Sequence, residues 1–161
     1  MHQPGHLRLR AAREALGLSD AEVAGRTGLS LADYAHLEAS ADAARQAVDL
    51  RHLRRVCEVL GVELWDLLDL ECGYCRGRGK PARELARRAR HELIRARRDA
   101  LGLARDALAR RLDVRIEAID SMMRDPYFLD TWPAAFVEDL ARMLEVPAQA
   151  LLDVPCPRCW R

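Results

Sequence analysis

The chain has 161 residues, which is enough for one ordinary domain or for two small domains of about 70 residues each. Ala, Leu and Arg are abundant and only eight residues are aromatic, a composition that favours an all-α protein. No apolar run approaches the roughly 20 residues that cross a bilayer, and the N-terminus lacks the apolar core of a secretory signal. We therefore expect a cytoplasmic protein with no membrane partner.

The net charge is only +1, but the charges are distributed unevenly along the chain. Residues 76–111 carry 13 Lys and Arg against 4 Asp and Glu, whereas residues 1–75 carry 8 against 12 and residues 112–161 carry 5 against 9. A basic segment between two acidic ones is typical of a surface that faces phosphates. An ordinary solvated helix is the alternative, because Arg is also a good helix former.

The first half of the chain predicts five short helices, separated by cap residues and glycines. They are expected over residues 7–16, 19–28, 30–38, 48–61 and 64–68. Ser19 and Ser30 are the expected N-caps, and Gly28 permits the tight turn between the second helix and the third. Residues 39–47 have no clear period and are expected to form a loop.

The second half repeats this order. Leu101-Gly-Leu-Ala matches Leu16-Gly-Leu-Ser at an offset of 85 residues, and the offset falls to 84 further along. The first helix of the repeat is expected from about Pro81 to Leu101, Thr131 and Pro133 should open the fourth helix, and Pro147 should open the fifth. The sequence thus predicts two tandem five-helix bundles over residues 7–71 and 82–154, with residues 72–81 and 155–161 as cysteine-bearing segments.

Several short motifs carry a family resemblance. They are Leu9-Arg-Ala-Ala-Arg13, Leu16-Gly-Leu-Ser19, Glu22-Val-Ala24, Gly28-Leu-Ser30, Tyr34, Leu37-Glu38 and Leu53 through Gly61-Val62. In order and spacing they resemble the Cro/phage-repressor helix-turn-helix family over residues 7–70, with a more diverged copy over residues 92–153. The resemblance implies that the third helix of each bundle enters the major groove of DNA.

The same resemblance implies an ion pair between Arg13 and Glu38 that ties the first helix to the end of the third. In the second copy Arg98 remains, but Met123 replaces the glutamate. We therefore expect the second bundle to be held mainly by packing.

The residues expected at a DNA interface are few and partly acidic. The base-facing positions of the first bundle are Leu31, Ala32, Asp33, Ala35 and His36, which include no Arg, Asn or Gln for a bidentate contact with a purine. Near the third helices the candidate contacts are Ser30, Asp33, His36, Arg115, Glu117 and Ser121. The candidate phosphate contacts are Arg87, Arg88, Arg110 and Arg111.

Two functions fit this pattern. One is a non-enzymatic transcriptional regulator that binds double-stranded DNA. The other is a protein-interaction module on the same scaffold, which presents Leu31, Tyr34 and Ile116 to a regulatory partner. A monomer and a homodimer are both compatible with either function. No catalytic constellation is found, because the histidines lie on separate predicted helices and no glycine-rich loop follows a strand.

Four of the five cysteines form two Cys-x-x-Cys pairs, Cys72 with Cys75 and Cys156 with Cys159, displaced by 84 residues. Two such pairs in turns can complete a tetrahedral four-thiolate shell, which predicts a structural zinc site that braces the two bundles. Cys72 to Gly79 also resembles the zinc knuckles of the cysteine-rich region in J-domain chaperones.

Disulfide or redox use of these cysteines is the alternative to zinc. A zinc site shared between two chains also remains open. The fifth cysteine, Cys57, lies in an apolar stripe and is expected to be a small buried hydrophobe.

Overall fold

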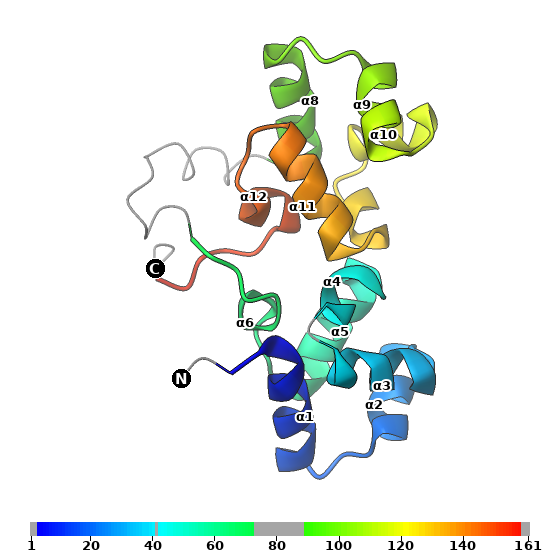
Figure 1. Ribbon diagram of the computed structural model, residues 1–161, viewed down its shortest axis with the longest axis vertical. Helices are drawn as coiled ribbons and strands as arrows, with labels where there is room; N and C mark the ends of the chain where they lie inside the picture. The colour runs from blue at the N-terminus through cyan, green and yellow to red at the C-terminus, as the bar shows by residue number, and fades with distance from the viewer. Residues whose placement is uncertain (1–2, 41, 73–88, 159–161) are drawn as a thin grey trace. The chain divides into compact units, whose positions relative to one another are not determined.

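The computed structural model describes residues 3–40, 42–72 and 89–158 (Figure 1). Within these ranges the regular elements are helices, as the all-α prediction requires. The chain divides into two compact units, Met1–Glu71 with Trp132–Ala134 (unit 1) and Cys72–Thr131 with Ala135–Arg161 (unit 2). No helix among the described residues has the length and the apolar character that crossing a membrane requires.

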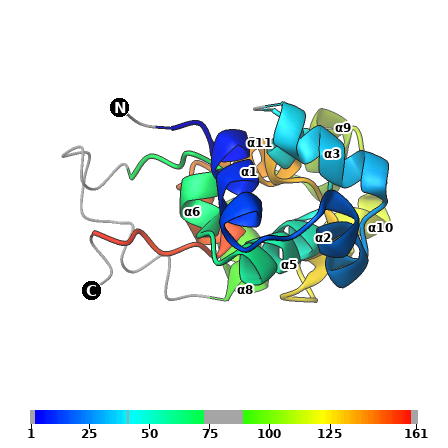
Figure 2. The ribbon, with the colours of Figure 1, turned by 90° about the horizontal axis from the view of Figure 1, so that it is seen from below.

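Unit 1 contains six helices in its described part. They are α1 (Gly5–Ala15), α2 (Asp20–Thr27), α3 (Leu31–Ala39), α4 (Ala43–Gln46), α5 (Leu50–Leu60) and α6 (Leu64–Leu67). Helix α1 packs against α3 and α6, and α2 packs against α3 and α5 (Figures 1 and 2). The core side chains Leu9, Val23, Tyr34, Leu53 and Val56 are fully buried, because each lies on the apolar face of its helix.

Helix α4 is a correction to the loop expected over residues 39–47. Its single turn buries Ala43 and Ala44, each 2% exposed. A helix of four residues is shorter than the window in which a helical period can be recognised, so its apolar residues left no periodic signal in the sequence.

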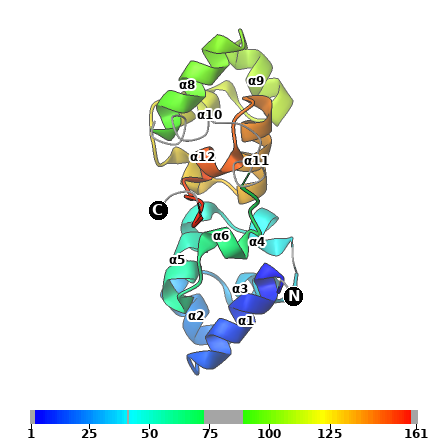
Figure 3. The same ribbon diagram turned by 90° about the vertical axis from the view of Figure 1, so that its left-hand side faces the viewer.

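Unit 2 contains α8 (Arg90–Ala100), α9 (Arg105–Leu112), α10 (Ile116–Met122), the 3-10 helix η1 (Phe128–Thr131), α11 (Ala134–Met143) and α12 (Ala148–Leu152). The boundary clustering assigns Trp132–Ala134, which includes the first residue of α11, to unit 1. Helix α9 packs against α10, and α10 is followed by η1 (Figure 3). Leu93, Ile94, Leu108, Ile119 and Leu140 are fully buried in this unit.

Two helix starts in unit 2 differ from the sequence prediction. Ala89 has an extended backbone with ψ of 138°, so α8 begins at Arg90, and residues 81–88 of the longer predicted helix lie outside the described residues. Thr131 does not open the fourth helix, because it ends η1 and its hydroxyl donates to the carbonyl of Phe128 at 2.8 Å. Pro133 directly precedes α11 and Pro147 caps α12, as expected.

The lengths of the helices and the positions of the turns recur at the spacing of the sequence repeat. Helices α1 and α8 each have 11 residues, and α2 and α9 each have 8. The residues with left-handed backbone pair at the same spacing, and they are Gly17 with Gly102, Gly28 with Asp113, Gly61 with Glu145, and Asp69 with Asp153. A left-handed residue ends a helix and sets the direction of the next, so the chain turns at corresponding places in the two units.

Candidate nucleic-acid interface

The turn between α2 and α3 is set by local hydrogen bonds. Ser19 caps α2: its backbone N–H donates to the Glu22 carboxylate at 2.8 Å, and the Glu22 N–H donates back to the Ser19 hydroxyl at 3.3 Å. Gly28 ends the helix with a left-handed backbone, φ of 78°, and its N–H donates to the carbonyl of Ala24. Helix α3 therefore leaves the turn in a fixed direction.

Ser30 and Asp33 are both used to start α3. The Asp33 backbone N–H donates to the Ser30 hydroxyl at 3.0 Å, and that hydroxyl donates to the Asp33 carboxylate at 2.6 Å. Both residues were predicted as DNA contacts, and they are exposed at the start of this helix. Their mutual bonds already give each side chain a structural role as part of the N-cap.

The exposed face of α3 contains the positions predicted to face bases. Leu31, Ala32, Asp33, Ala35 and His36 are exposed, and Leu31 retains 53% of its accessible surface. Tyr34, Leu37 and Glu38 are buried on the opposite face. Tyr34, expected above as part of a presented surface, instead belongs to the core, because its position on the helix points inward.

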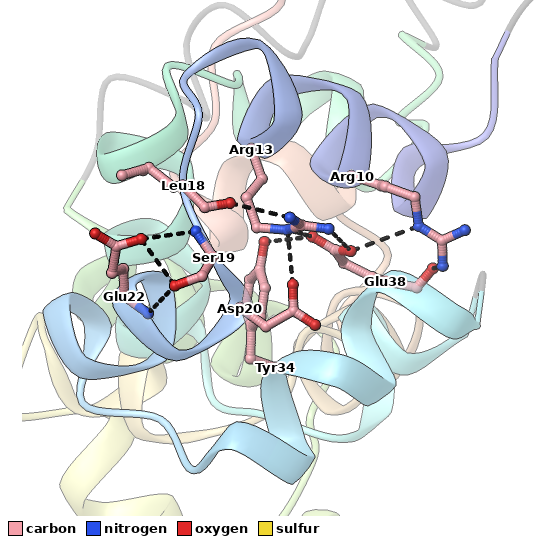
Figure 4. A network of polar contacts seen from close by, with 8 residues as sticks. All are labelled: Arg10, Arg13, Leu18, Ser19, Asp20, Glu22, Tyr34 and Glu38. Carbon is pink, nitrogen blue, oxygen red and sulfur yellow. Dashed lines mark hydrogen bonds and ion pairs between the residues drawn. The ribbon is translucent and has the colours of Figure 1, made fainter.

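A buried ion pair fixes the far end of α3 (Figure 4). Arg13 donates to the two carboxylate oxygens of Glu38, with Nε–Oε1 and Nη2–Oε2 distances of 2.7 and 2.9 Å. The Tyr34 hydroxyl donates to the same carboxylate at 2.6 Å, and Asp20 lies 3.0 Å from the Arg13 guanidinium. The ion pair that the family resemblance implied is therefore present, with Tyr34 as an additional donor.

The pKa values in this network reflect those bonds. Burial by itself would raise the pKa of Glu38, but the hydrogen bonds from Arg13 and Tyr34 outweigh it and hold the pKa below its ordinary value. Burial and the bond to Glu38 raise the pKa of the Tyr34 hydroxyl, and the bond to Glu38 raises the pKa of Arg13. The network therefore keeps a charged pair and a neutral phenol.

Arg55 is a basic residue near the turn that the sequence reasoning missed. It lies on α5, is exposed, and places Nη1 3.7 Å from the position that a Cβ on Gly28 would occupy. The two residues are far apart in sequence, so no local motif could connect Arg55 with the helix-turn-helix.

In unit 2 the predicted contacts lie around α9 and α10. Arg111, Arg115 and Glu117 are exposed, and Arg110 forms an exposed ion pair with Asp106 at 2.9 Å. The Ser121 hydroxyl donates to the carbonyl of Glu117 at 2.9 Å, which leaves it half-buried along the helix. Arg87 and Arg88 lie outside the described residues.

Unit 2 has a buried ion pair of its own, which corrects the expectation that packing alone would hold it. Arg90 donates to both carboxylate oxygens of Asp130 at 2.8 and 2.9 Å, and the two residues are 7% and 9% exposed. Burial disfavours the charged form of Arg90, but its bonds to Asp130 outweigh this and raise the pKa of the guanidinium. The pair joins residues 40 positions apart, so the sequence gave no local sign of it.

The predicted zinc ligands are described only in part. Cys72 is half-buried and Cys156 is 7% exposed, and the clustering assigns both to unit 2. Cys75 and Cys159 lie outside the described residues. Cys57 is buried within α5, as expected, and burial raises the pKa of its thiol to about 12. A thiol that stays protonated is a poor metal ligand.

Comparison with known proteins bears on the geometry of unit 1. Residues 9–64 match a family model described as helix-turn-helix. The match extends from α1 to the first residue of α6 and includes the α2–turn–α3 segment and the Arg13–Glu38 pair. No curated protein and no solved structure matches the chain.

Proposed function

We propose that the chain is a DNA-binding transcriptional regulator without enzymatic activity. The observation that carries this proposal is the capped α2–turn–α3 segment, which lies within the matched residues and has an exposed face at the start of α3. In a helix-turn-helix the second of the two helices enters the major groove by its N-terminal residues. Helix α3 with His36 and the start around Ser30 would supply that contact here.

Unit 2 would be a second helix-turn-helix module. The recurrence of helix lengths and left-handed turns at an offset of 85 residues supports this, with α9 and α10 in place of α2 and α3. Arg110, Arg111 and Arg115 would contact phosphates, which position a protein on the duplex without reading its sequence. Glu117 and Ser121 would lie nearest to the bases.

A structural zinc ion held by Cys72, Cys75, Cys156 and Cys159 would complete the protein. A thiolate shell of this kind stabilises a fold directly, because the ligands are held together only in the folded state. The assignment of Cys72 and Cys156 to one compact unit supports a shared site. Zinc would then join the ends of the two modules in one chain, or in a homodimer.

DNA binding can be tested with a random-sequence duplex and the full chain, using fluorescence anisotropy at two salt concentrations. We expect binding that weakens steeply with salt, since about six phosphate contacts lose roughly a thousandfold in affinity between 50 and 200 mM salt. Replacing Arg110 and Arg111 together with Ala should reduce the slope of log affinity against log salt by about 2. Arg142→Ala, an exposed arginine paired with Asp139 on α11, is the matched control.

A protein-interaction module is the second candidate, and one observation favours it. Leu31 and Ile116 occupy corresponding positions at the starts of α3 and α10 and are 53% and 37% exposed. Exposed apolar side chains at the centre of a surface are typical of protein contacts. Absence of duplex binding at low salt would contradict the DNA proposal and leave this candidate, in which Leu31→Glu should abolish partner binding.

A further inference from the structure

Four arginines surround a cavity of about 430 Å³ on the surface of unit 2. They are Arg95 and Arg98 on α8, Arg105 at the start of α9, and Arg124 just after α10. Asp99, Asp120 and Met123 complete the lining. The volume falls within the range of about 300–1,000 Å³ that small-molecule sites occupy.

The corresponding place in unit 1 has a different charge balance. At an offset of 85 residues, Arg10 and Arg13 correspond to Arg95 and Arg98, so both basic residues of α1 are retained in α8. Three other positions change, with Asp20 replaced by Arg105, Glu38 by Met123, and Ala39 by Arg124. Unit 2 thus loses the buried carboxylate that neutralises Arg13 in unit 1 and gains two guanidinium groups.

The positive charge that remains is only partly neutralised within unit 2. Arg105 pairs with Asp120 at 2.9 Å, Arg98 pairs with its neighbour Asp99, and Arg95 donates to the backbone carbonyl of Met123 at 2.6 Å. Four arginines and two aspartates leave a net charge of +2 around the cavity. In unit 1 the aligned Arg10, Arg13, Glu14, Asp20 and Glu38 sum to −1.

We propose that this cavity binds a phosphate-type dianion. A guanidinium presents five N–H donors in a planar fork that matches phosphate oxygens, and one internal bond leaves most of those donors available. Arg98 is only 18% exposed while Arg105 is 51% exposed, so the cluster combines a screened base with an accessible rim. The excess of two positive charges matches two negative charges on the ligand.

The proposal concerns the residues of unit 2 alone and does not rest on the DNA-binding function. The same anion chemistry has two sources, a free phosphorylated small molecule or a phosphate of a nucleic-acid strand. Pyrophosphate is a suitable probe for the shared chemistry, because it carries adjacent phosphoryl groups and no base or sugar.

The test is a calorimetric titration of the full chain with pyrophosphate at constant ionic strength. We expect binding that weakens about tenfold or more in Arg105→Asp and in Arg124→Ala, because each change removes charge-assisted donors. Both substitutions introduce the unit 1 residue at an exposed position, so the fold should be retained. Arg142→Ala, which removes an exposed arginine elsewhere in unit 2, should bind pyrophosphate as the wild type does.

Met123→Glu offers a more demanding variant. It restores the carboxylate of unit 1 beside Arg95 and Arg98, and we expect it to abolish pyrophosphate binding by neutralising the site internally. No binding by the wild type at about 10 mM pyrophosphate, or equal weakening by Arg142→Ala, would overturn the proposal.

A competition arm assigns the source of the anion. If a duplex displaces pyrophosphate and the substitutions weaken both ligands by the same factor, the site takes a strand phosphate. If pyrophosphate binds equally well in the presence of saturating duplex, it takes a free phosphorylated molecule. Pyrophosphate binding without any duplex binding would support the anion site and contradict only the proposed DNA-binding function.

Discussion

Glu38 illustrates how one residue organises unit 1. Its side chain is only 5% exposed, yet it carries a charge that is satisfied by Arg13, Tyr34 and the more distant Arg10. A buried pair of this kind adds little net attraction over an apolar pair, but removing one partner is costly because the other charge stays buried. The pair therefore matters chiefly through what happens when it is broken.

Replacing Glu38 with Gln should lower the free energy of unfolding of unit 1 by about 3 kcal/mol, because Arg13 would lose its main counter-ion. Urea denaturation measures the loss, and amide hydrogen exchange in α1 and α3 assigns it to unit 1. Arg142→Ala breaks only an exposed pair with Asp139 and should cost less than about 0.5 kcal/mol. Equal losses in the two variants would contradict the structural role of the buried pair.

Acid should weaken unit 1 through the same carboxyl. Burial raises the pKa of Glu38, but the bonds from Arg13 and Tyr34 outweigh it and hold the pKa below its ordinary value of 4.5. A depressed folded-state pKa adds stability that is complete above the unfolded-state pKa and is lost as the pH falls through the folded-state pKa. The unfolding free energy of the wild type should therefore fall more steeply below pH 4.5 than that of Glu38→Gln. Parallel pH profiles would show that Glu38 does not contribute this dependence.

At the scale of the elements, the turns that follow the helices differ in cost between the two units. Gly61 ends α5 with φ of 65°, whereas Glu145 adopts φ of 53° at the corresponding place after α11. Glycine adopts a left-handed backbone without steric cost, and a residue with a Cβ does not. The ion pair of Glu145 with Arg97 is 3.6 Å long and largely exposed on the Glu145 side, so it offsets little of this strain.

We therefore expect Glu145→Gly to raise the free energy of unfolding by up to about 1 kcal/mol, because it relieves the left-handed strain. Thermal or urea denaturation measures the gain. The reciprocal change, Gly61→Glu, should be destabilising, since open space around Gly61 does not remove the backbone cost. A loss of stability in Glu145→Gly would show that the contact with Arg97 outweighs the strain.

At the scale of the whole molecule, the proposed zinc site connects cysteines that are far apart in sequence. Replacing Cys156 with Ala should remove zinc from the purified protein and lower its thermal midpoint, because a four-thiolate site loses its geometry with any ligand. Metal analysis of the full chain checks this. Cys57→Ala is the matched control, since its buried thiol has a pKa of about 12 and should not bind metal. Full zinc content in Cys156→Ala, or its loss in Cys57→Ala, would contradict the site.

The sequence by itself predicted the helical class, the caps Ser19 and Ser30, and the turn at Gly28. These features depend on residues within one or two helical turns of each other, so local chemistry is enough to specify them. The Arg13–Glu38 pair was predicted only through a family resemblance, because its partners lie 25 positions apart. Whether the exposed face of α3 binds DNA is a question of chemistry that neither the helical pattern nor the fold answers by itself.

Only the tertiary structure decided which distant residues meet. It joined Arg90 to Asp130 and placed four arginines around one cavity, and it turned part of a predicted loop into α4. Each of these outcomes depends on how helices pack rather than on their own periodicity. A charged side chain can be satisfied by any correctly placed partner, so its sequence position limits the choice very little, and packing of the apolar faces makes the selection.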